Sequence, residues 1–407
     1  SYALRSRRAG IYAATLLAVS PWVISYGWEA RMYPLGMVFA LLSSYALLHA
    51  IRDKSFTWFS LYGLLAVALA YTHYYWFFTI AGQILFTVGV LVRSTKWRIG
   101  EMVQSRIFWG GVLSASIAIV LFSPWLPVFL QQLSQVQNNY WVPPIASTSI
   151  PDTFYHFFVP TVDIVPHHGL ILLVSLLPIV GTIILWLYCS ILFRKNDGVR
   201  FIVLLGVVPM LMSIFISFTG RSLYNDRFFA FSGIFIFVLI AYVLSVIKKP
   251  ILRRILFLLF VLGLLLALMQ YRNELDIEHK IGSHAATKYI YTERKNTEQV
   301  LVSSPFVYFA VLHYATEEFL TKDDVHLYSK TGELSHFSGG PILTQADIVG
   351  AQDIAKFKGV VWVVDTTGFG EGAFEQPKNW QEIYKQPFPE VFGYQGDVIV
   401  RKFLVHL

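Results

Sequence analysis

The stretch SPWVISYGWEARMYPLGMVF, residues 20–39, decides the fold, because an acid and a base, Glu29 and Arg31, interrupt an almost unbroken apolar run. The whole chain is apolar: of its 407 residues, 55% are hydrophobic, 16% are aromatic and only 14% are charged. Soluble domains carry about 25% charged residues. The composition therefore predicts a multi-pass membrane protein in which Glu29 and Arg31 lie at the end of a span.

Nine apolar runs are each close to the roughly 20 residues that a helix needs to cross the hydrocarbon core of a membrane. They cover residues 10–26, 35–51, 57–72, 75–92, 107–122, 170–193, 201–218, 229–247 and 251–270. We therefore expect a mainly α fold with a transmembrane domain over residues 1–270. The chain starts with Ser and enters a span almost at once, so we also expect further sequence upstream.

The basic residues predict how this domain is oriented, because Lys and Arg next to a span favour the cytoplasmic side. Alternate connections are rich in them, at residues 5–8, 52–54, 93–106, 194–200 and 248–254. The other connections contain only Arg31, Arg221 and Arg227, and residues 124–169 contain no Lys or Arg. These poor connections, and everything after about residue 270, are expected on the outer, periplasmic face. The net charge of +7 then reflects topology and does not indicate a nucleic-acid partner.

A composition shift after residue 270 predicts a second, soluble α/β domain over residues 299–407, with residues 271–298 as a linker or an amphipathic segment. The expected helix covers residues 306–319, and the expected strands cover residues 300–304, 325–329, 360–365 and 397–403. The one cysteine of the chain, Cys189, lies in a predicted span. A disulfide within the chain is therefore excluded, and a thiolate metal site is not expected.

Several ionisable residues fall at the outer ends of predicted spans that are far apart in the sequence. They are Glu29, Arg31, His73, Arg221, Asp226 and Arg227. Each one alone could be a pair or an anchor at the end of a helix. Ionisable groups at membrane depth are costly and usually face a cavity or a partner, so the set as a whole favours a functional site.

Two further segments are candidates for this site. His73 lies among aromatic residues in AYTHYYWFF, and it is either a hydrogen-bonded structural residue or a group that transfers protons or binds a metal. Residues 131–160 form a long segment with little charge, rich in Asn, Gln, Pro and aromatic residues. This segment is either a plain outer loop or a lid over a sugar, because sugar rings stack on aromatic faces and bond to amides.

Three elements together resemble the bacterial GT-C membrane glycosyltransferases related to the protein O-mannosyltransferase family (glycosyltransferase family 39-like). They are SPWVISYGWEARMYPLGMVFALLSSYALLHAI, LAYTHYYWFF one hairpin later, and DRFFAFSG at the entry to a later span. The aminoarabinose transferase of lipopolysaccharide modification is similar in plan. The resemblance implies an inverting enzyme of the bacterial inner membrane that passes a sugar from a polyprenyl-phosphate carrier to an envelope lipid, glycan or protein. It does not imply which sugar.

The resemblance also implies roles for residues. The donor phosphate is expected at Arg31, Arg221 and Arg227. The substrates are expected at Tyr33, His73, Tyr74, Asn138, Tyr140, Trp141 and Tyr224. The catalytic aspartate of the resemblance lies upstream of this chain, between two spans that would bring the total to about eleven. Glu29 is then a supporting acid that orients Arg31 or helps to hold a divalent cation, Mg²⁺ or Mn²⁺, and no other cofactor is expected.

Two other classes of function stay open. A transporter or flippase of lipid-linked sugars would share the spans and the charged outer end, but transporters typically contain inverted repeats, and the sequence contains no convincing repeat. A membrane scaffold that binds a partner through its outer domain would leave the charged residues without a role. A polar cavity at the outer leaflet favours the transferase, whereas a pathway through both leaflets favours transport.

Overall fold

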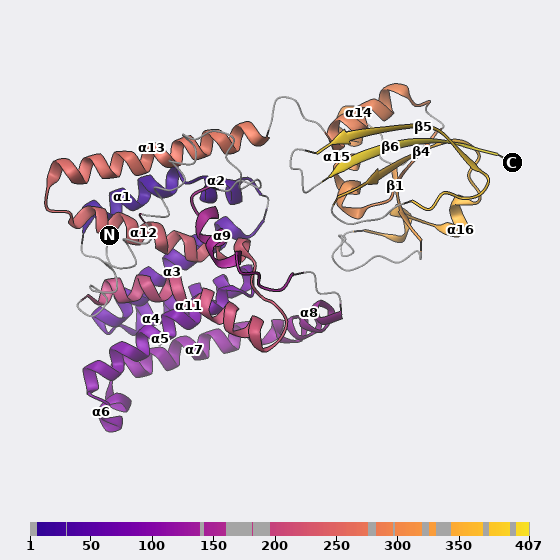
Figure 1. Cartoon of the computed structure of the whole chain (residues 1–407). Helices are drawn as coiled ribbons and strands as arrows, with labels where there is room; N and C mark the ends of the chain where they lie inside the picture. The colour runs from indigo at the N-terminus through magenta and orange to yellow at the C-terminus, as the bar shows by residue number, and fades with distance from the viewer. Residues whose placement is uncertain are drawn as a thin grey trace. The chain divides into compact units, whose positions relative to one another are not determined.

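The computed structural model of the chain consists of two compact units, Ser1–Tyr271 and Arg272–Leu407 (Figure 1). Each unit is described by itself. The described residues are 6–29, 31–138, 142–159, 181, 196–275, 282–295, 298–319, 325–330, 343–368, 374–390 and 396–406.

The first unit is helical, which confirms the mainly α prediction. Its helices are α1 (Arg7–Ala18), α2 (Pro21–Trp28), α3 (Tyr33–Asp53), α4 (Phe56–Thr72), α5 (Trp76–Thr95), α6 (Ile99–Gln104), α7 (Arg106–Phe122), η1 (Ser123–Trp125), α8 (Leu126–Asn138), α9 (Ser149–His156), α11 (Asp197–Thr219), η2 (Asp226–Phe229), α12 (Ala230–Val246) and α13 (Pro250–Leu275). The closest packing joins α3 to α4, α4 to α7, α1 to α12, and α11 to both α5 and α12.

Among the described residues, five helical segments are long and apolar enough to cross a membrane, or six with a bent pair. The five are Tyr33–Asp53, Trp76–Thr95, Arg106–Ser134, Asp197–Thr219 and Pro250–Arg272. Helix α4 and the segment Ser232–Val246 are apolar but shorter. The predicted span at residues 170–193 lies outside the described residues, so the count of nine stays a prediction.

The first predicted span is not one straight helix. Over residues 10–26 the chain instead forms α1 and α2, which meet at an angle of 54°. The Oγ of Ser20 accepts a hydrogen bond from the backbone N–H of Val23 and so caps α2, and Pro21 is its first residue. Proline disfavours helical geometry in the residue before it and lacks the N–H that would continue the helix, so the break falls here.

The basic connections gather at one end of the helical unit. Arg8 at the start of α1 donates to the carbonyl of Ser245 near the end of α12, at 3.5 Å. Arg93 near the end of α5 forms an ion pair of 2.9 Å with Asp197 at the start of α11. The opposite helix ends, which carry the candidate site residues, therefore face away from this basic end.

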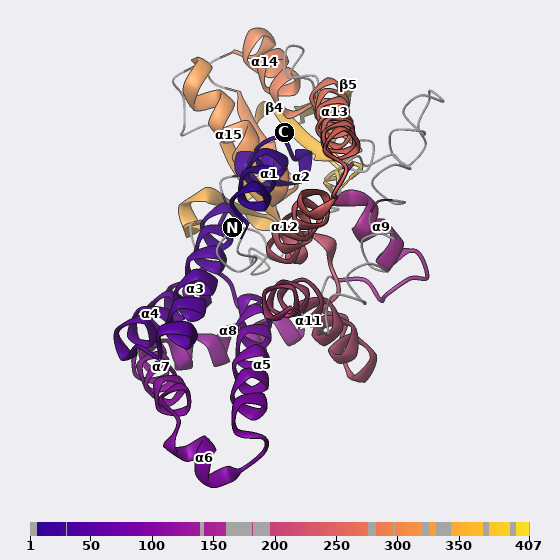
Figure 2. The same cartoon turned by 90° about the vertical axis from the view of Figure 1, so that its left-hand side faces the viewer.

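The outer helices of this unit expose apolar side chains. Helices α13 and α7 lie at opposite edges of the unit in both views (Figures 1 and 2). In the candidate span of α13, only 11% of the residues are buried. In the candidate span that begins with α7, only 6% are buried. In α13, Leu258 and Leu262 are 62% and 52% exposed. Apolar surface on this scale is compatible with contact with lipid chains, as in a membrane protein.

The second unit is an α/β domain with a six-stranded sheet in the order β3-β2-β1-β4-β6-β5. Strands β3, β2, β1 and β4 are parallel to one another, and β6 is antiparallel to both β4 and β5. The elements are α14 (Ser283–Glu293), β1 (Gln299–Val302), α15 (Pro305–Phe319), β2 (Val325–Ser329), η4 (Gln345–Asp347), β3 (Ile348–Gly350), α16 (Ala351–Ile354), β4 (Gly359–Thr366), β5 (Trp380–Pro389) and β6 (Asp397–Val405).

The four predicted strands and the predicted helix of this unit are confirmed as β1, β2, β4, β6 and α15. Strands β3 and β5 were not expected. Helix α14 falls within the predicted linker segment at residues 271–298. Its Ala286 and Ile290 are fully buried in the core with residues of the sheet, so this part of the segment belongs to the domain core.

Gly36 in α3 allows close packing next to the candidate site, because an added Cβ would overlap the buried ring of Trp76 at the start of α5. We expect Gly36→Ala to lower the free energy of unfolding by about 1–3 kcal/mol through overpacking. Gly111→Ala in α7 is the matched control, since a Cβ there meets nothing within 4 Å. Thermal unfolding in detergent measures both, and equal stability of the two variants would contradict the packing argument.

Candidate functional site

Three connections between helices meet at the end of the helical unit that lies away from the basic residues. The ring of His73, between α4 and α5, lies 6.4 Å from that of Tyr33 at the start of α3 and 5.3 Å from that of Phe228 in η2. The ring of Tyr75 lies 4.3 Å from that of Phe228, and its hydroxyl donates to the carbonyl of Leu223. We call Tyr33, His73, Tyr75 and Phe228 the aromatic junction.

Two of the three predicted arginines lie within electrostatic range of Tyr33, one residue of the aromatic junction. Arg31 and Arg227 are both close enough to the hydroxyl of the buried Tyr33 to interact with it electrostatically. Arg31 also pairs with Glu29 across 3.6 Å, and both side chains are about half exposed. An exposed pair adds little stability, so it mainly orients the guanidinium. The structure therefore brings Glu29, Arg31, Tyr33, His73 and Arg227 together.

Arg227 is held in place by the two residues before it. The Oδ1 of Asn225 accepts hydrogen bonds from the backbone N–H of Arg227 at 3.2 Å and from its Nε at 3.3 Å. The Oδ1 of Asp226 accepts from the same backbone N–H at 2.7 Å. Asparagine and aspartate commonly bond to nearby backbone N–H groups in this way. These bonds fix both the turn and the guanidinium stem of Arg227.

Helix α9, part of the segment predicted as a lid, docks on the same loop through two side-chain contacts. The Nδ1 of His156 lies 2.8 Å from Oδ2 of Asp226. The hydroxyl of Tyr224, which was predicted to bind substrate, donates to Oγ1 of Thr153 at 2.9 Å. His156 was not among the predicted site residues, although its position among the aromatic residues of FYHFF is similar to that of His73.

The environment of Asp226 favours its charged form. Burial alone would raise the pKa of this carboxyl. The hydrogen bond and charge of His156, the backbone N–H of Arg227 and the charge of Arg227 outweigh burial, so the pKa of Asp226 lies below its ordinary value. The ionised Asp226 can accept hydrogen bonds on both oxygens, and it is a weak base.

His73 is neutral at pH 7, because burial lowers its pKa to about 4. Its Nδ1 accepts a hydrogen bond of 3.1 Å from the backbone N–H of Tyr75. The proton of the neutral ring therefore lies on Nε2, which leaves Nε2–H as a donor. Both the structural and the functional interpretations of His73 remain compatible with this arrangement.

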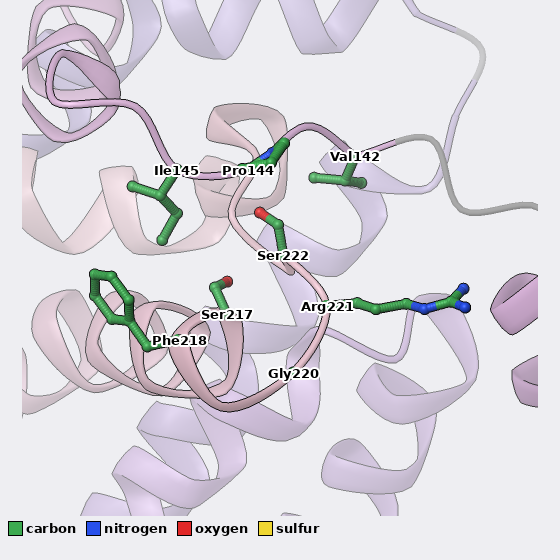
Figure 3. Close-up of a pocket in the computed structure, with 8 residues that line it drawn as sticks. All are labelled: Val142, Pro144, Ile145, Ser217, Phe218, Gly220, Arg221 and Ser222. Carbon is green, nitrogen blue, oxygen red and sulfur yellow. The ribbon is translucent and has the colours of Figure 1, made fainter.

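A cavity of about 570 Å³ lies beside the third predicted arginine, Arg221 (Figure 3). One wall is the chain after α8, with Val142, Pro144 and Ile145, and the other is the end of α11 and the loop that follows it. In Figure 3 the side chains of Ile145 and Phe218 lie on the same side of the cavity, and that of Arg221 extends in the opposite direction. The cavity thus has apolar side chains on one side, a positive charge at the other, and the hydroxyls of Ser217 and Ser222 on its wall.

The remaining predicted residues are Tyr74, Asn138, Tyr140 and Trp141, of which the last two lie outside the described residues. Tyr74 donates from its hydroxyl to Oε1 of Gln132 in α8 at 2.6 Å and accepts from Nε1 of Trp125 at 2.9 Å. Asn138 is the last residue of α8.

Within the described parts of the chain, no group of three or more His, Cys, Asp or Glu residues is placed to hold a metal ion. Glu29 has Arg31 as its ionic partner. The divalent cation at Glu29 therefore stays a prediction.

Comparisons with known proteins return no relative: no family model matches the chain, and no curated protein matches it. The resemblance described above therefore stays a prediction.

The pKa of His73 leads to a pH dependence of stability. A histidine with a folded pKa of about 4 and an unfolded pKa of about 6.5 stays neutral in the folded state while the unfolded chain takes up a proton. The free energy of unfolding is thus highest above pH 6.5 and falls as the pH drops from about 6.5 to about 4. In His73→Gln this decrease should be smaller. Denaturant unfolding in detergent at several pH values measures it, and equal pH dependence in both proteins would exclude a buried neutral His73.

Proposed function

We propose that this protein is a membrane glycosyltransferase that moves a sugar from a polyprenyl-phosphate carrier to an envelope lipid, glycan or protein at the outer face of the bacterial inner membrane. The observation that carries the proposal is that Arg31 and Arg227, from connections far apart in the sequence, both lie within electrostatic range of one buried tyrosine, Tyr33, at the end of an apolar helical unit. A polyprenyl phosphate has a long apolar tail and an anionic head. Its tail needs an apolar surface such as that of the helices, and its head needs positive charge such as that of the two arginines.

The two arginines would supply the charge that this chemistry requires. Guanidinium groups bind phosphate oxygens through two parallel hydrogen bonds, and they stabilise the charge that develops as the phosphate leaves the sugar. Glu29 would orient Arg31, and Asn225 holds the stem of Arg227. Tyr33 and the Nε2–H of His73 would offer hydrogen bonds to the phosphate or the sugar.

Transfer to an acceptor hydroxyl also needs a base. In the resemblance the base is an aspartate of the first outer loop, between the first two spans. Asp226 is a poor substitute, because its two oxygens already accept hydrogen bonds and its pKa is lowered. We therefore assign no base among the described residues.

The second candidate is a transporter of lipid-linked sugars. The bend of 54° between α1 and α2, beside Glu29 and Arg31, favours it, because transporters commonly build their sites at broken helices. Chemistry distinguishes the two functions, since a transporter moves the intact carrier lipid and a transferase cleaves the bond between sugar and phosphate.

The deciding experiment adds radiolabelled polyprenyl-phosphate sugars to membranes that contain the full-length protein. A transferase moves the label to an extractable lipid, a glycan or a protein, whereas membranes that lack the protein do not. Label that crosses the membrane while still attached to its carrier would contradict the transferase and support transport.

Arg227→Ala should lower the transfer rate at least tenfold while expression stays near normal, because a charge-assisted phosphate contact is worth about 1.5–3 kcal/mol. Arg227→Lys should restore the rate only in part, since an ammonium group cannot make the two parallel bonds. Arg98→Ala is the matched control, because Arg98 is 71% exposed and pairs with Glu101 away from the junction. Wild-type transfer by Arg227→Ala would show that Arg227 only anchors a helix end.

A further inference from the structure

His156 is the residue of α9 that reaches the loop of Arg227 with an ionisable side chain. Its Nδ1 contacts Oδ2 of Asp226 at 2.8 Å, and the other oxygen of that carboxylate accepts the backbone N–H of Arg227. A continuous chain of hydrogen bonds thus runs from the segment predicted as a lid to the backbone of a predicted phosphate-binding arginine. We propose that His156 is a positioning residue, which acts through Asp226 to hold Arg227 for a phosphate. This inference rests on the proposed function.

The carboxylate needs this second partner. The side chain of Asp226 is 38% exposed, so burial penalises its ionised form only in part, and donors on its oxygens compensate for the water that it does lose. The backbone N–H of Arg227 satisfies one oxygen and His156 satisfies the other. With His156 absent, Asp226 would turn toward water, and the short turn of η2 would keep only the bond between Asn225 and the backbone N–H of Arg227 and lose the one with Asp226.

The contact between His156 and Asp226 is not the only one that holds α9 in place. Helix α9 is also held by the bond between Tyr224 and Thr153, and Phe157 directly after it packs its ring 5.1 Å from that of Trp22 in α2. Removal of the imidazole therefore leaves α9 anchored on both sides. An effect of His156 on Arg227 would then come through Asp226 and not through loss of the helix.

The atom that makes the contact gives the inference a sharp test. Asparagine places its amide nitrogen close to the position of the histidine Nδ1, whereas glutamine places it close to that of Nε2. If His156 acts by donating from Nδ1 to Asp226, then His156→Asn keeps the function and His156→Gln loses it. A role for Nε2 as a base or a ligand would be rescued by neither variant.

The experiment measures the binding of farnesyl phosphate to the full chain in detergent by calorimetry, with uncharged farnesol as the reference for the apolar tail. We expect His156→Ala and His156→Gln to weaken binding about fivefold or more, as the loss of an ordered charge-assisted contact does. His156→Asn and the control Thr153→Val, which removes the hydrogen bond between Tyr224 and Thr153 but not the contact of His156, should stay within about twofold of the wild type. Farnesol binding should not change in any variant. In the transfer assay, His156→Ala should raise the donor KM and leave kcat near normal.

The outcomes separate this inference from the proposed function. Wild-type protein that binds farnesyl phosphate no better than farnesol would overturn both. Binding by the wild type together with equal affinity in His156→Ala would overturn the positioning role alone. Equal loss in His156→Asn and His156→Gln would also overturn it, because Nδ1 would then not be the atom that matters.

Discussion

The site depends on Tyr75, which joins two separate connections through three different parts of one residue. Its backbone N–H donates to Nδ1 of His73, its ring packs on Phe228, and its hydroxyl donates to the carbonyl of Leu223. The first contact shapes the turn between α4 and α5, and the other two fix the loop between α11 and α12 against it. Since Tyr33 packs on the same histidine, the arginines of two distant connections share one location.

This arrangement offsets the free-energy cost of removing charged groups from water at the end of an apolar helical unit. A charged group at the end of an apolar helix is stable only when a partner replaces the water that it loses. Here Glu29 and Arg31 partner each other, and Asp226 has His156 and the backbone of Arg227. These contacts offset the cost of desolvation, and they also restrict where each side chain lies. The positive charge of Arg227 therefore occupies a defined position in the absence of any ligand.

The sequence predicted the helices well and their interruptions poorly. An apolar run of about 20 residues is a strong signal, but hydropathy averages over a break such as the one at Ser20 and Pro21. In the second unit, β4 and β6 have runs of β-branched residues, and β1 and β2 are short but mostly apolar, so all four are easily recognised. Strand β5 is largely exposed and contains Pro387 and Pro389, and β3 has only three residues, so neither has that signal. The contact between His156 and Asp226 depends on tertiary packing, which no local pattern encodes.

The two arginines and the segment after α7 would recognise different parts of a lipid-linked sugar, because their side chains differ chemically. Guanidinium groups bind any phosphate, so Arg31 and Arg227 would accept every polyprenyl-phosphate donor equally. Discrimination among sugars requires hydroxyl-specific hydrogen bonds and a shaped apolar wall. Under the proposed function, those features would come from the segment after α7, where Gln132 bonds to Tyr74 and Ile145 lines the cavity beside Arg221. Because His156 lies in that same segment, the part of the chain suited to read the sugar is hydrogen-bonded to the loop that would hold the phosphate.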